Sequence, residues 1–99
     1  MNALSETELE TALSGLEGWS VKDDKLTKRF EFDSFRDATC FLMRLAFEVE
    51  EMNHHPEIEN IYNQVRFSLC THDAGGKVTE KDVKMAKQIE DLHGRVPGA

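Results

Sequence analysis

Hydrophobic residues recur at steps of three and four in a segment near each end of the chain, which predicts a helix in each. The first helix is expected over residues 5–18, where Ser5 and Glu8 have the spacing of an N-terminal capping box. The other is expected after Thr79, which forms a second cap-like pair with Asp82. Each helix would turn an apolar stripe toward the rest of the protein.

A longer amphipathic helix is expected in the middle of the chain. Asp33 or Ser34 suits its N-terminus, since either side chain can accept a hydrogen bond from a free backbone N–H group. The helix should end at Asn53 or His54, because Pro56 disfavours helical backbone at the residue before it. The predicted core-facing stripe consists of Phe35, Ala38, Leu42, Leu45, Val49 and Met52.

Alternation of apolar and polar residues predicts four strands in two pairs. Residues 19–22 and 26–32 lie on either side of an Asp-Asp turn, whereas residues 57–63 and 64–72 meet at an Asn-Gln turn. In this second hairpin His72 would stand at the end of a strand.

The predicted order of elements is therefore αββαββα. Paired strands that alternate with helices favour an α+β two-layer sandwich, in which three helices pack on one face of a four-stranded antiparallel sheet. A chain of 99 residues has room for one hydrophobic core, so residues 1–99 are expected to form a single domain.

Net charge, hydrophobicity and cysteine content each argue against one class of protein. The formal charge of −7 would repel a phosphate backbone, which argues against direct nucleic-acid binding. No stretch approaches the roughly 20 apolar residues that a membrane span requires, and the acidic N-terminal segment does not resemble a signal peptide. Cys40 and Cys70 are too few for a small secreted scaffold, so we expect free thiols in the cytoplasm.

Three of the four histidines lie within residues 54–72, at predicted ends of elements. Imidazole has an unperturbed pKa of about 6.5, so these side chains can donate and accept protons near neutral pH. Glu50 precedes His54 by four residues, which would place both on one helix face. Each histidine taken alone also fits a surface or helix-capping position, and it is their grouping that favours acid-base chemistry.

Seven residues in the second half of the chain form a specific pattern, namely Glu50, His54, His55, Pro56, Tyr62, His72 and Asp82. This pattern resembles the signature of the pterin-4a-carbinolamine dehydratases. The likeness extends over nearly the whole chain, since Gly18-Trp19 and Phe30-Glu31-Phe32 also fit the layout of that family. Asn53 departs from the pattern, because many members carry an acidic residue there, and this would weaken the electrostatic support of the histidines.

The resemblance implies a hydro-lyase that expels water from a 4a-hydroxytetrahydropterin and thereby recycles the pterin cofactor of aromatic amino acid hydroxylases. It implies that His54, His55 and His72 are the catalytic groups, that Glu50 orients one of them, and that no metal or cofactor takes part. The substrate would be a small pterin. For Tyr62 packing within a strand is the favoured role, and for Asp82 a helix cap.

Two other chemistries remain open from the residues alone. His54, His55, His72 and Cys70 are all competent metal ligands, although adjacent histidines project in different directions. Cys70 and His72 could also form a nucleophilic pair, although residues two apart on a strand rarely bring their side chains into hydrogen-bond range.

An interaction module is the alternative class of function. Cys40, Met43 and Phe47 recur at helical spacing beside the core-facing stripe of the long helix. Either a thicker core buries them, or they form a surface for self-association. Members of the resembled family form oligomers and can serve as dimerisation partners of a transcription factor. The expected partners are therefore a second copy of the chain through the long helix and, as an option, a regulatory protein.

Overall fold

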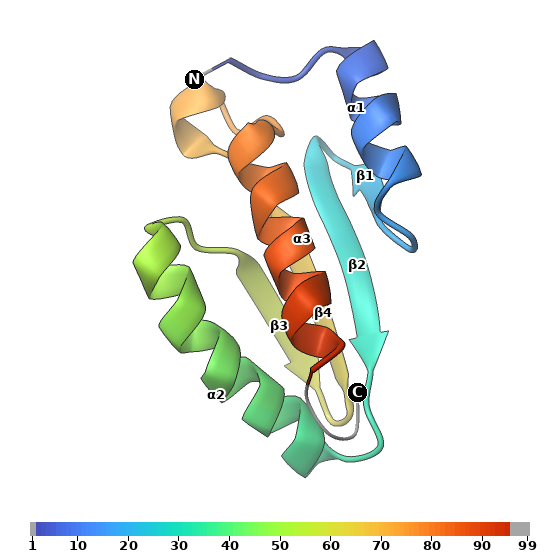
Figure 1. The fold of residues 1–99 in the computed structure, drawn as a ribbon, viewed down its shortest axis with the longest axis vertical. Coiled ribbons are helices and arrows are strands. Elements are labelled where there is room, and N and C mark those ends of the chain that lie inside the picture. The colour runs from blue at the N-terminus through green and yellow to red at the C-terminus, as the bar shows by residue number, and fades with distance from the viewer. Residues whose placement is uncertain (1, 96–99) are drawn as a thin grey trace.

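The computed structural model describes residues 2–95. Its elements follow the predicted order, with one additional 3-10 turn (Figure 1). They are α1 (Glu6–Ser14), β1 (Ser20–Lys22), β2 (Lys25–Glu31), α2 (Phe35–Met52), β3 (Glu57–Ile61), β4 (Gln64–Leu69), η1 (His72–Ala74) and α3 (Glu80–His93).

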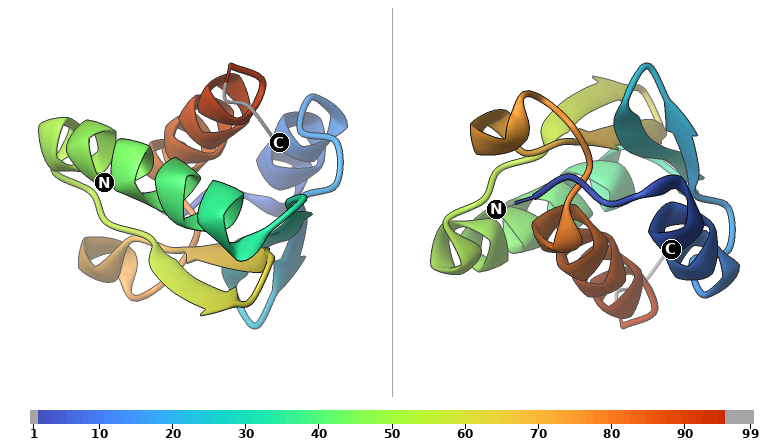
Figure 2. Two further views of the ribbon diagram at one scale, coloured as in Figure 1. Left: turned by 90° about the horizontal axis from the view of Figure 1, so that it is seen from below. Right: turned by 90° about the horizontal axis from the view of Figure 1, so that it is seen from above.

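The four strands form one antiparallel sheet in the order β1-β2-β4-β3. Phe30 of β2 lies opposite Val65 of β4, so the apolar residues of neighbouring strands share one face. The helices cover that face and leave the other face open, as the two views in Figure 2 show. The predicted α+β sandwich is thus confirmed.

Aromatic and aliphatic side chains from the sheet, α2 and α3 fill the space between the two layers. Phe41 of α2 is fully buried, and its ring centroid lies 5.2 Å from that of Phe32 and 6.1 Å from that of Phe67. Burial of one such side chain typically stabilises a fold by about 1.5–3 kcal/mol. The predicted stripe omitted Phe41 and wrongly included Phe35, whose side chain is exposed.

The predicted helix starts are confirmed, whereas the first helix ends at Ser14, with Gly15 as its C-cap, and does not extend to Gly18 as expected. Both capping boxes form, and Ser34 is the N-cap of α2. Helix α2 ends at Met52, and Asn53 follows with a left-handed backbone (φ 53°), a conformation that asparagine adopts more readily than most residues. No helix in the described part of the chain is long and apolar enough to span a membrane.

The second hairpin differs from the prediction in the position of its turn and in the end of its second strand. Its turn lies at Tyr62, which has φ of 52°, so the tyrosine is exposed in the turn instead of packing on a strand. Strand β4 stops at Leu69, which still pairs with Leu26 of β2, whereas its pairing with β3 ends at Ser68 because Leu69 faces Pro56, which has no backbone N–H to donate. His72 consequently begins the turn η1 and is not a strand-end residue.

Candidate active site

Three of the predicted site residues meet in one surface depression of about 260 Å³, at the end of the molecule where α2 ends and α3 begins (Figure 1). We call it the histidine depression, and its lining consists of Asn53, His54, His55, Thr71, His72, Asp73 and Lys81. The loop after α2, the turn η1 and the first turn of α3 supply these side chains. Residues 18 apart in sequence, His54 and His72, therefore reach the same surface.

His54 is held by a carboxylate from another helix. Its Nε2 atom lies 2.6 Å from Oδ1 of Asp82, and the side chain of His54 is only 13% exposed. Because a carboxylate can only accept hydrogen bonds, we assign the hydrogen to Nε2. This assignment leaves Nδ1 of His54 as the ring atom that can exchange a proton with a ligand.

Asp82 is fully buried and has several hydrogen-bond donors around it. Its Oδ2 atom accepts from the backbone N–H of Thr79 at 2.8 Å and from the hydroxyl of Thr71 at 2.9 Å. The predicted capping role of Asp82 is confirmed, but sequence reasoning missed that the second carboxylate oxygen orients His54. A carboxylate has about four acceptor positions, so one side chain can serve both purposes.

Glu50 pairs with His55 and not with His54 as the spacing suggested. Its Oε1 atom lies 3.0 Å from Nε2 of His55, and both side chains are exposed. The expected i,i+4 pair would need helix to continue through His54, whereas the left-handed backbone at Asn53 redirects the chain. His54 therefore turns toward α3, and the exposed carboxylate orients the next histidine instead.

His72 is the first residue of η1, and its side chain is exposed at the rim of the depression. Two backbone hydrogen bonds close this turn, from Ala74 N to Thr71 O and from Gly75 N to His72 O. Within the described residues its imidazole has no hydrogen-bonded partner, so both ring nitrogens remain available to a ligand.

The two rival chemistries gain no support from this geometry. Burial raises the pKa of the Cys70 thiol, which disfavours the thiolate that a nucleophile requires. Among residues 2–95 no three His, Cys, Asp or Glu side chains are arranged to hold one metal ion. Cys40 and Cys70 are both free thiols.

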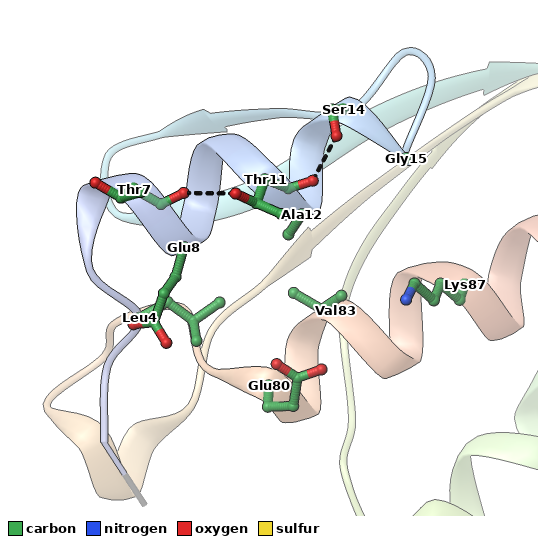
Figure 3. A pocket seen from close by; sticks show the side chains of 10 residues that line it. All are labelled: Leu4, Thr7, Glu8, Thr11, Ala12, Ser14, Gly15, Glu80, Val83 and Lys87. Carbon is green, nitrogen blue, oxygen red and sulfur yellow. Dashed lines mark hydrogen bonds between the residues drawn. The ribbon is translucent and has the colours of Figure 1, made fainter.

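A larger depression of about 440 Å³ lies between α1 and α3 and contains no histidine (Figure 3). Two of its three hydroxyl groups are engaged locally, since Thr11 donates to the carbonyl of Thr7 and Ser14 to that of Thr11. Glu8 is likewise engaged in the capping box of α1. We therefore place the acid-base site in the smaller histidine depression.

Comparison with known proteins identifies the family of this chain. Residues 2–92 match the family described as pterin 4 alpha carbinolamine dehydratase. A protein of Opitutus terrae that is provisionally named a pterin-4-alpha-carbinolamine dehydratase is 47% identical over 90% of this chain and 92% of its own. One of Christiangramia forsetii with the same provisional name is 44% identical over 93% of this chain and 94% of its own.

Solved structures show the same fold. A crystal structure described as a transcriptional coactivator/pterin dehydratase from Brucella melitensis superposes with a TM-score of 0.86, at 39% identity over 92% of this chain and 98% of that one. A pterin dehydratase-like protein described as a RuBisCO assembly factor in the alpha-carboxysome gives a TM-score of 0.64 at 28% identity, over 77% of this chain and 87% of that one. The chain therefore belongs to the pterin-4-alpha-carbinolamine dehydratase family.

Proposed function

We propose that this protein dehydrates a 4a-hydroxytetrahydropterin to the quinonoid dihydropterin and water, and that the histidine depression is its active site. The observation that carries the proposal is the convergence of three imidazoles, one of them oriented by a buried carboxylate, in a single depression. Family membership supports the same reaction. In the cell this step would recycle the pterin used by aromatic amino acid hydroxylases.

The reaction needs two proton transfers. The bond between C4a and the hydroxyl oxygen breaks, and a proton must reach that oxygen because hydroxide is a poor leaving group. The ring must also lose the proton on N5, so that the electron pair of this N–H bond forms the new double bond between N5 and C4a. One acid and one base at suitable positions complete the reaction, and the products are the quinonoid ring and water.

The histidines suit these transfers because each can act as acid or base near neutral pH. In the proposal His54 exchanges its proton through Nδ1, since Nε2 faces Asp82. His55 is oriented by Glu50, and His72 has no competing partner among the described residues. A positioned acid-base group typically contributes about 10²–10⁴-fold to a rate.

A direct assay tests the proposal. Purified protein should accelerate dehydration of a synthetic 4a-hydroxytetrahydropterin, followed by the absorbance of the quinonoid product, above the rate in buffer alone. Addition of a chelator should leave the rate unchanged, because the proposed transfers use only side chains. A rate equal to that of the buffer at micromolar protein would overturn the proposal.

We also infer that α2 carries a self-association surface. Cys40 is exposed, and the side chains of Met43 and Phe47 are 62% and 74% exposed although they recur at helical spacing. Within residues 2–95 no thicker core buries them, and large exposed apolar patches generally mark interaction sites. A second copy would cover this face, or alternatively a regulatory protein. Light scattering should report more than one chain per particle, and a monomer at high micromolar concentration would contradict the inference.

We also propose that the protein acts in the cytoplasm, because this reducing compartment keeps thiols such as Cys40 and Cys70 unpaired.

A further inference from the structure

A second depression adjoins the histidine depression and shares two of its residues. It has a volume of about 410 Å³ and is lined by Met52, His54, Glu80, Lys81 and Lys84. His54 and Lys81 line both depressions, so a ligand in one can extend past the imidazole into the other. Together the two spaces have the size of an ordinary small-molecule site.

Two lysines and one carboxylate line the second depression, so its charged side chains leave an excess of positive charge. Lys81 and Lys84 are exposed and stand three residues apart on α3, which places them on one helix face. Neither forms a salt bridge within residues 2–95, in contrast to Lys28, whose ammonium group lies 2.7 Å from Glu90. Glu80 supplies the one carboxylate among the lining residues.

The charge of these two lysines is opposite in sign to the net charge of the protein. The net charge of −7 repels anions over most of the surface. The two ammonium groups beside the acid-base site form no salt bridge within the described part of the chain and therefore give this region a local preference for anions. The half-buried thioether of Met52 forms the apolar part of the same lining. An apolar linker that ends in an anionic group would match this combination.

We propose that the second depression receives the substituent on C6 of the pterin, and that Lys81 and Lys84 select substrates whose substituent ends in a carboxylate or a phosphate. This inference rests on the proposed function, because it assumes that the pterin ring occupies the histidine depression. Because His54 borders both depressions, a ring placed against its imidazole lies next to the second one, where a substituent can reach Met52. A neutral substituent would fill the space without contacting either charge.

The test compares 4a-hydroxytetrahydropterins that differ only at C6, with a neutral dihydroxypropyl group, a carboxylate-terminated group or a phosphate ester. The wild-type protein should show a higher kcat/KM for the two anionic substrates. Because an exposed ion pair is worth little, Lys84→Met should reduce the anionic-to-neutral ratio roughly two- to fivefold, and the Lys81→Met/Lys84→Met double variant by about tenfold. The loss should fall on KM, since these contacts exist before the reaction begins.

Lys87→Met is the matched control. Lys87 is an exposed lysine on the same helix, but it lines the depression between α1 and α3 and not the one beside His54 (Figure 3). This variant should keep the wild-type ratio. Raising the salt concentration from about 0.01 M to about 1 M should abolish the preference of the wild-type protein, because the Debye length falls from about 30 Å to about 3 Å. The carboxylate and phosphate arms show which anion is preferred.

A binding measurement separates the two hypotheses. Pterin fluorescence reports the affinity for stable 7,8-dihydropterins with the same substituents, independently of turnover. If neutral and anionic pterins bind equally well, or if the double variant keeps the preference, the lysine inference is wrong while the proposed function stands. If no pterin binds or reacts, the proposed function fails and the inference fails with it.

Discussion

Replacing Asp82 with Asn separates the two contributions that this buried carboxylate makes. The amide is nearly isosteric and keeps one oxygen that can accept from the backbone N–H of Thr79, so the cap of α3 is largely retained. The negative charge beside His54 is lost, and the amide NH₂ group can then donate to Nε2. This contact would favour the other tautomer, with hydrogen on Nδ1.

The magnitudes of the two effects differ. A positioned acid-base group contributes about 10²–10⁴-fold to a rate, and His54 in the other tautomer would lose part of this contribution, so we expect Asp82→Asn to lower kcat about 10–100-fold. In Asp82→Asn the Thr71 hydroxyl still has Thr79 Oγ1 at 2.6 Å as a partner. The free energy of unfolding of this variant should therefore be only about 1–2 kcal/mol lower than that of the wild type. Asp82→Ala leaves several buried groups unpaired and should lower the free energy of unfolding by about 3–5 kcal/mol.

Dehydration kinetics and urea unfolding followed by circular dichroism measure the two quantities on the same preparations. Glu8→Gln is the matched control, because Glu8 occupies the same capping-box position in α1 but lies away from the histidines. Its kcat should equal that of the wild type. An Asp82→Asn protein with wild-type kcat would refute the orienting role, and one that is unfolded would show that the charge is needed for the cap.

Three further predictions concern the histidines of the depression, the exposed face of α2 and the buried His93. Replacing any of the three histidines of the histidine depression with Ala should lower turnover by about 10²-fold or more. Glu50→Ala should have a smaller effect, because its pair with His55 is exposed. Steady-state kinetics of the four variants measure both effects. Met43→Glu should dissociate an assembly formed through α2 while the circular dichroism of the fold persists, and an unchanged particle size in light scattering would exclude that surface. Burial lowers the pKa of His93 below 6.5, so the unfolded chain binds more protons than the folded one and stability is lost as the pH falls below about 6.5. His93→Leu should flatten this slope in unfolding measurements between pH 7 and pH 5, roughly the range in which an imidazole titrates, and an unchanged slope would contradict the assignment.

The sequence predicted most of the fold because its signals are local. Capping residues such as Ser5 and Ser34 act within one helical turn, and strand alternation depends only on which side chains can face a core. The two errors in the second hairpin arose where tertiary context decides. The pairing of β3 with β4 ends where β3 reaches Pro56, and the position of the hairpin turn depends on the register of the sheet.

The three histidines of the candidate site could be predicted from the sequence, but which carboxylate pairs with which histidine could not. Sequence spacing suggested that Glu50 orients His54, since the two are four residues apart. The structure instead pairs His54 with Asp82, 28 positions away, and no local rule connects those positions. Such a contact depends on how α2 and α3 approach each other, which a single sequence does not specify.

The same network that starts α3 also fixes the geometry of the histidine depression. The hydroxyls of Thr71 and Thr79 lie 2.6 Å apart, and both residues contact the carboxylate of Asp82. Thr71 directly precedes His72, so its backbone position determines where that imidazole begins, while Asp82 determines where His54 points. A change that disturbs the cap should therefore displace two of the three imidazoles together. Stability of this helix start and acid-base activity are expected to be coupled for that reason, in contrast to the exposed pair of Glu50 and His55, which can be lost without affecting the core.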